Sequence, residues 1–136
     1  MFVRRGFAAL MIVGAVIMVS ACRTRTVHNV ADRPIPAATQ RLPLDQIGQT
    51  IMEAGRQRHW RMDPAGPGQI TGVFDHHGHQ AVINITYSQQ AYSITLAGST
   101  NFGQQGDEIN KQYNRSIRQL EHAIDDRLAM AGYATR

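Results

Sequence analysis

The chain has 136 residues, a formal net charge of +4 and a single cysteine. This length fits one small domain, and one cysteine excludes an intramolecular disulfide. The 14 Lys and Arg residues exceed the 10 Asp and Glu residues by too little to favour nucleic-acid binding, so we expect no nucleic-acid partner.

The first 21 residues have the composition of a secretory signal peptide. Arg4 and Arg5 form a short basic region, and residues 6–19 are almost wholly apolar. Fourteen residues in a helix span about 21 Å, which is less than the roughly 30 Å hydrocarbon core of a bilayer. The segment 1–21 therefore predicts a signal peptide rather than a membrane-spanning helix.

The apolar run ends in a motif that resembles the lipobox of bacterial lipoproteins, Val19-Ser20-Ala21-Cys22. In such proteins the signal peptidase accepts only small residues before its cleavage site. A diacylglycerol is attached to the thiol of the cysteine that follows. We expect cleavage between Ala21 and Cys22, with palmitate-type acyl chains attached at Cys22. Two or more chains anchor a protein stably in a membrane. The alternatives are an ordinary signal peptide followed by a buried cysteine, and a twin-arginine signal.

The residue after the cysteine indicates which membrane receives the anchor. In lipoproteins an aspartate at this position retains the protein at the inner membrane, whereas this chain has Arg23. We therefore expect a protein that is lipid-anchored in the outer membrane, with its domain facing the periplasm.

Residues 22–43 are predicted to be a flexible basic tether. The segment contains three prolines, four arginines against one aspartate, and few large apolar residues. Basic residues close to a membrane are attracted to anionic headgroups. Fully extended, such a segment reaches about 70 Å, so the folded domain would stand clear of the membrane.

Two predicted helices bracket a single domain that we expect over residues 44–136. The first begins at Asp45 and ends near His59. The second runs from near Glu108 to Ala131, with apolar residues three or four positions apart along its length. We expect this long C-terminal helix to lie across the apolar face of a sheet.

Three predicted strands lie between the helices, at 70–74, 81–87 and 91–96. Apolar residues alternate with polar or small ones in each, as in strands with one buried face. The joining segments 75–78 and 88–90 are short enough for hairpins. The predicted fold class is therefore α+β: a three-stranded antiparallel β-meander between an N-terminal helix and a C-terminal helix packed on one face.

The stretch from Gly66 to Leu128 resembles a family of small, functionally uncharacterised Gram-negative bacterial lipoproteins. The matching pieces include Ala81-Val-Ile-Asn-Ile-Thr-Tyr87 and the pair Tyr113-Asn114 in the C-terminal helix, which is the most distinctive of them. In the family an aromatic residue often follows two positions after this pair, where this chain has Ser116. The resemblance implies a fold rather than an activity.

A histidine cluster, His76, His77 and His79, could supply nitrogen ligands to zinc or copper. Gly78 lies where the hairpin must turn, which breaks the alternation that would aim His77 and His79 in the same direction. The cluster is interpreted mainly as exposed turn histidines. We expect any metal affinity to be weaker than micromolar, and no cofactor other than the covalent lipid.

Trp60 follows the first helix and is interpreted either as a core anchor or as a platform for a ligand. With Tyr113 and Asn114 it makes up a possible interaction surface. The chain has no G-x-S-x-G serine and no phosphate-binding glycine loop, so we expect neither an enzyme nor a small-molecule substrate. The predicted function is a binding or scaffolding module with an envelope protein partner. The alternative is a periplasmic metal-binding protein that uses the histidine hairpin.

Overall fold

The computed structural model describes residues 24–134. The predicted signal peptide, with the cleavage and lipidation sites at Ala21 and Cys22, lies outside these residues. No helix within 24–134 is both long and apolar enough to cross a bilayer. In chain order the elements are β1 (Thr24–Thr26), β2 (Val30–Pro34), the 3-10 helix η1 (Thr39–Arg41), α1 (Leu44–Gln57), β3 (Arg61–Gly66), β4 (Gln69–His76), β5 (His79–Tyr87), β6 (Ala91–Thr100), β7 (Glu108–Asn110) and α2 (Lys111–Ala134).

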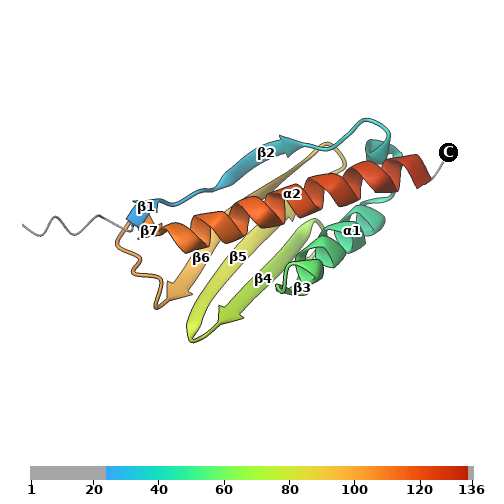
Figure 1. Ribbon diagram of the computed structural model, residues 1–136. Coiled ribbons are helices and arrows are strands. Elements are labelled where there is room, and N and C mark those ends of the chain that lie inside the picture. Colours follow the sequence, from blue (N-terminus) through green and yellow to red (C-terminus); the bar gives the residue numbers. More distant parts are fainter. Residues whose placement is uncertain (1–23, 135–136) are drawn as a thin grey trace, which may run out of the picture.

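An antiparallel sheet of five strands, in the order β2-β6-β5-β4-β3, forms the centre of the fold (Figure 1). A separate two-stranded sheet joins β1 to β7. The α+β class and the β4-β5-β6 meander are confirmed, but three strands is an undercount. The strand β3 was missed because its sequence, which includes Pro64, is typical of a turn. A proline is tolerated there because β3 is an edge strand.

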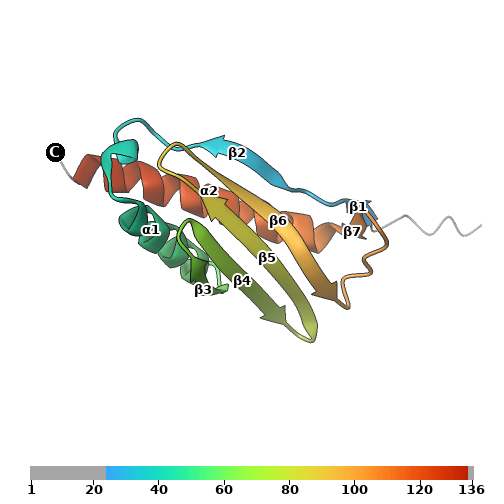
Figure 2. The same ribbon diagram turned by 180° about the vertical axis from the view of Figure 1, so that it is seen from behind.

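Both helices cover the same face of the sheet, and the other face is open (Figure 1 and Figure 2). The predicted apolar stripe of α2 is buried, from Tyr113 to Leu128. It packs over the isoleucines that β4, β5 and β6 point to the same side, all of them at most 1% exposed: Ile70, Ile83, Ile85 and Ile94. The core therefore lies between one sheet face and two helices.

The segment 24–43 differs from the flexible tether predicted over 22–43. Thr24 is the partner of Asn110 in the β1–β7 sheet, and β2 pairs with β6 along the edge of the larger sheet. Ile35 is buried. The residue pattern allowed one short edge strand at Thr26–Val30, ended by Pro34, whereas the structure has strands on either side of that stretch, at Thr24–Thr26 and Val30–Pro34.

Candidate functional site

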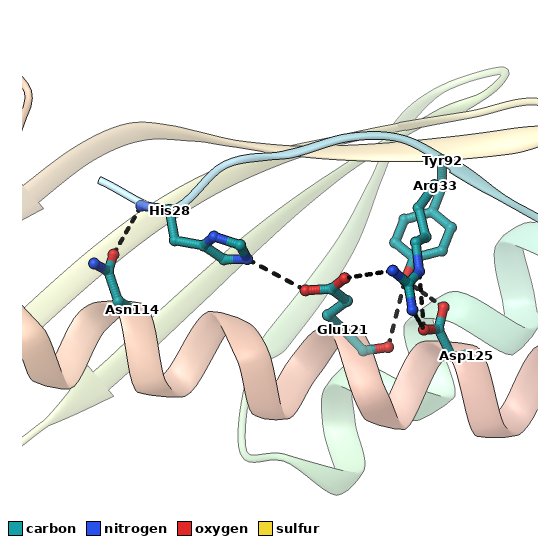
Figure 3. A network of polar contacts seen from close by, with 6 residues as sticks. All are labelled: His28, Arg33, Tyr92, Asn114, Glu121 and Asp125. Atoms are coloured by element: carbon teal, nitrogen blue, oxygen red, sulfur yellow. Dashed lines mark hydrogen bonds and ion pairs between the residues drawn. The ribbon is translucent and has the colours of Figure 1, made fainter. Parts of the chain in front are cut away.

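A polar network fastens the N-terminal strap, residues 24–34, to α2 (Figure 3). Asn114 of α2 is 3% exposed. Its Oδ1 accepts a hydrogen bond of 2.8 Å from the backbone N–H of His28, and its Nδ2 donates one of 2.8 Å to the carbonyl oxygen of Thr26. An amide side chain has both a donor and an acceptor. Asn114 can therefore pair with a backbone N–H and a backbone carbonyl of the strap, as the backbone of a neighbouring strand does.

Two carboxylates on the same face of α2 continue this network (Figure 3). Glu121 Oε2 lies 3.3 Å from His28 Nε2, and Glu121 Oε1 lies 3.4 Å from a guanidinium nitrogen of Arg33. Asp125 accepts a hydrogen bond of 2.8 Å from Arg33 and one of 2.7 Å from the hydroxyl of Tyr92. The two acids are four residues apart, which places them side by side on the helix. Their contacts join three elements: the strap, β6 and α2.

Two buried tyrosines have strongly perturbed acidities. Burial, and then the hydrogen bond to Asp125, raise the pKa of Tyr92 well above its ordinary value. Burial alone raises the pKa of Tyr113 in the same direction, and the Tyr113 hydroxyl has no hydrogen-bond partner among residues 24–134. The hydrogen bond to Asp125 also raises the pKa of Arg33. Both phenols therefore stay protonated at neutral pH and act as structural groups.

The predicted interaction surface of Trp60, Tyr113 and Asn114 is not exposed. These residues are 2%, 1% and 3% exposed, respectively. The ring centroid of Trp60 lies 5.2 Å from that of Phe74, so the core-anchor interpretation of Trp60 fits the structure. The Tyr113-Asn114 pair, which is distinctive in the family resemblance, has a structural role in this protein. Tyr113 packs in the core and Asn114 binds the strap.

The predicted histidine cluster lies at the β4–β5 turn. His76 and His79 are the last cross-strand pair of this hairpin, and His77 and Gly78 form the turn with positive φ angles of 50° and 78°. The Nδ1 of His79 lies 2.7 Å from the carbonyl oxygen of Asn101. Residues 24–134 contain no group of three His, Cys, Asp or Glu side chains placed to hold a metal ion. The rings of His76 and His77 lie close together, with centroids 4.0 Å apart, but no third ligand of residues 24–134 joins them.

The long axis of α2 gives the molecule two ends. The hairpin end holds β1, β7, the β4–β5 turn and the loop 101–107, and the turn end holds η1, the start of α1 and the β5–β6 turn (Figure 1). At the hairpin end, two adjoining hollows of about 260 and 310 Å³ share Phe74, His76, Ser116 and Gln119. Their lining mixes aromatic rings with polar and charged side chains, among them Arg58, Asp75 and Arg115.

A hollow of about 390 Å³ opens at the turn end, between α1 and the β3–β4 turn. Tyr87 borders this hollow and a neighbouring one of about 330 Å³. Close backbone packing shapes the site: a Cβ on Gly48 would overlap the Tyr87 hydroxyl, and one on Gly68 would come within 2.7 Å of the Tyr87 carbonyl oxygen. Such a volume falls at the lower end of the range of small-ligand sites. The rim is polar, with Asp45 and Gln49.

The open face of the sheet is mainly made of small polar and β-branched side chains, with the exposed Arg61–Asp63 ion pair at the β3 edge. One row across the strands contains Thr71, Asn84 and Thr95, and Val73 and Val82 are neighbours in the next row. Small polar and β-branched side chains agree with the solvated face that the alternation predicted. This face offers area for contact with a partner.

Sequence reasoning missed the strap network and the turn-end hollow. The network has a signal in the sequence, because Asn114, Glu121 and Asp125 recur at helical spacing on one face. The hollow has none, since it joins three segments that are distant in the chain. No known protein family, curated protein or solved structure matches this chain.

Proposed function

We propose that this chain is a lipoprotein of the Gram-negative outer membrane, anchored through lipid on Cys22, whose domain faces the periplasm and binds an envelope protein without enzymatic activity. The observation that carries the proposal is the position of the single cysteine. It follows Ser20-Ala21 directly after the apolar residues 6–19. A cysteine retained for packing alone has no reason to occur at the end of such a run.

The chemistry of the described domain favours binding over catalysis. Its buried polar side chains, such as Asn114 and Tyr92, hold elements of the fold together. The turn-end hollow beside Tyr87 is the candidate partner site, because it combines apolar lining with a polar rim. The small excess of positive charge favours a protein partner over nucleic acid.

The anchor is tested by labelling cells with a palmitate analogue and determining the mass of the mature N-terminal peptide. We expect a labelled protein in the outer-membrane fraction whose first residue is lipid-modified Cys22. Cys22→Ser should abolish both label and membrane association. The matched control Ser20→Ala keeps a small residue in the motif and should retain both. Label that persists in Cys22→Ser would contradict the anchor.

The binding role is tested by placing a photo-crosslinking residue at Gln49, on the rim of the turn-end hollow. We expect one defined adduct in intact cells, which is lost when bulk is added to the hollow with Leu44→Trp. A crosslinker at Thr95, on the open sheet face, is the control site. Equal adducts from Gln49 and Thr95 would show that the hollow is not the binding site.

The metal-binding alternative would use His76, His77 and His79. No geometry among residues 24–134 supports it, because no three potential ligands of that range converge. The contact of His79 Nδ1 with the Asn101 carbonyl oxygen leaves Nε2 of His79 without a role in this hydrogen bond, as in metal-binding histidines, so it does not count against the alternative. Zinc or copper binding at this hairpin is therefore kept as the alternative proposal, and it would need a further ligand from outside the hairpin.

A further inference from the structure

The fold begins almost immediately after the proposed lipid site. Thr24 already belongs to β1, and it is only two positions after Cys22 in the sequence. Two residues reach at most about 7 Å even when fully extended. The stand-off of about 70 Å that a flexible tether over 22–43 would allow is therefore not available to the domain.

The first strand cannot swing away from the body of the domain without breaking contacts. Thr24 and Thr26 pair with β7, and the backbone N–H of Val27 donates a 2.7 Å hydrogen bond to the carbonyl oxygen of Asp107. Asn114 then holds the next residues of the strap to α2. Holding Cys22 at a membrane would therefore hold the whole hairpin end close to that membrane.

The other segments of the hairpin end are tied together. Asn101 donates a 2.7 Å hydrogen bond to the carbonyl oxygen of Gly78, which connects the loop 101–107 to the β4–β5 turn. The loop residues 101–106 carry no charged side chain. Beside them Arg25 and Lys111 are balanced by Asp107 and Glu108, and Arg23 adds one positive charge between the lipid site and Thr24. This end therefore offers hydrogen-bonding groups and a small positive charge, both of which suit a layer of anionic headgroups.

We infer that the hairpin end rests against the outer-membrane headgroups, held there by the lipid on Cys22, and that the turn end points into the periplasm. The inference depends on the proposed anchor. Helix α2 starts directly after β7 at the hairpin end and runs away from it for about 36 Å, the length of 24 helical residues. The hollow beside Tyr87 therefore faces away from the membrane, and the hollows beside His76 face it.

The orientation is tested on the full lipidated protein in vesicles of phosphatidylethanolamine and phosphatidylglycerol that contain a lipid with a headgroup-attached quencher. A fluorophore is attached to Gln105→Cys in the loop 101–107, or to Gln90→Cys in the β5–β6 turn. Both residues are exposed. We expect the label at 105 to lose most of its fluorescence and the label at 90 to keep it.

Equal quenching at both sites, or stronger quenching at 90, would overturn the orientation. The intact mass of each sample shows separately whether the protein carries lipid. A protein without lipid would refute the proposed anchor, whereas the quenching of lipidated protein tests the orientation alone. The same labels on Cys22→Ser protein, mixed with the same vesicles, should both stay bright. Quenching at 105 in that unlipidated protein would overturn the conclusion that the lipid holds this end at the membrane.

Discussion

Replacing Asn114 by alanine should loosen the strap selectively. Asn114 makes two hydrogen bonds of 2.8 Å, one with the backbone N–H of His28 and one with the carbonyl oxygen of Thr26. Asn114→Ala removes both and leaves the two backbone groups without their partner. The side chain is 3% exposed, so the lost atoms come from a packed site rather than from the surface.

The expected cost follows from the number of bonds. An intramolecular hydrogen bond contributes about 1 kcal/mol net, so two of them amount to about 2 kcal/mol in the free energy of unfolding. The strap is partly solvated at His28, so water can reach its freed N–H and the cost should not rise far above this sum. For a domain of this size, 2 kcal/mol corresponds to a fall in Tm of about 8 °C.

Urea unfolding of mature protein with Cys22→Ser measures this cost, with the single buried Trp60 as the fluorescent probe. Gln119→Ala is the matched control, because it removes an exposed amide from the same helix and should change stability by less than about 0.5 kcal/mol. Hydrogen exchange at the His28 amide should accelerate in Asn114→Ala. Equal stabilities of Asn114→Ala and Gln119→Ala would refute the assignment of Asn114 as the attachment of the strap.

Three further predictions concern packing, pH and metal. Gly48→Ala places a methyl group against the tip of Tyr87, and the overpacking cost of about 1–3 kcal/mol is reduced by about 1 kcal/mol of better helix propensity, so a net loss of about 1 kcal/mol is expected in urea unfolding. Gly98→Ala, where nothing lies within 4 Å of the added Cβ, should be near neutral, and equal costs would contradict the packing argument. Burial raises the pKa of Tyr92 and Tyr113 in the folded state. The free energy of unfolding should therefore be constant below their ordinary pKa of 10 and fall as the pH rises above it. Urea midpoints that stay constant across pH 10 would contradict this prediction. Equimolar zinc at micromolar concentration should leave Tm unchanged, and a rise would restore the histidine hairpin as a metal site.

The parts of the fold that the sequence predicted correctly are those with a regular hydrophobic period. The stripe from Tyr113 to Leu128 and the alternation over 81–87 reflect burial of one face, and both faces are buried as expected. The apolar residues at these positions leave few other arrangements that would hide them. This is why α2 and the β4-β5-β6 meander could be identified from residues alone.

The parts that were missed depend on partners distant in the chain. The strand β1 is defined by the pairing of Thr24 with Asn110, and nothing in the polar sequence around Thr24 indicates that partner. Edge strands β2 and β3 contain prolines, which favoured tether and turn interpretations. Asn114 was assigned to a possible interaction surface because the Tyr113-Asn114 pair is distinctive in the family resemblance, whereas its burial is explained by the two backbone groups that it satisfies.

The route of the strap has a mechanical consequence. The segment enters at the hairpin end and runs beside α2 toward the turn end, and its antiparallel hydrogen bonds to β6 lie across its direction. A pull between Cys22 and a partner held near Tyr87 would therefore load these bonds in shear, all at once, together with the contacts of Asn114, Glu121 and Asp125. Bonds loaded in parallel resist tension better than bonds that open one after another, so the proposed anchor at Cys22 and the proposed partner site near Tyr87 would pull on the strap in its more resistant direction.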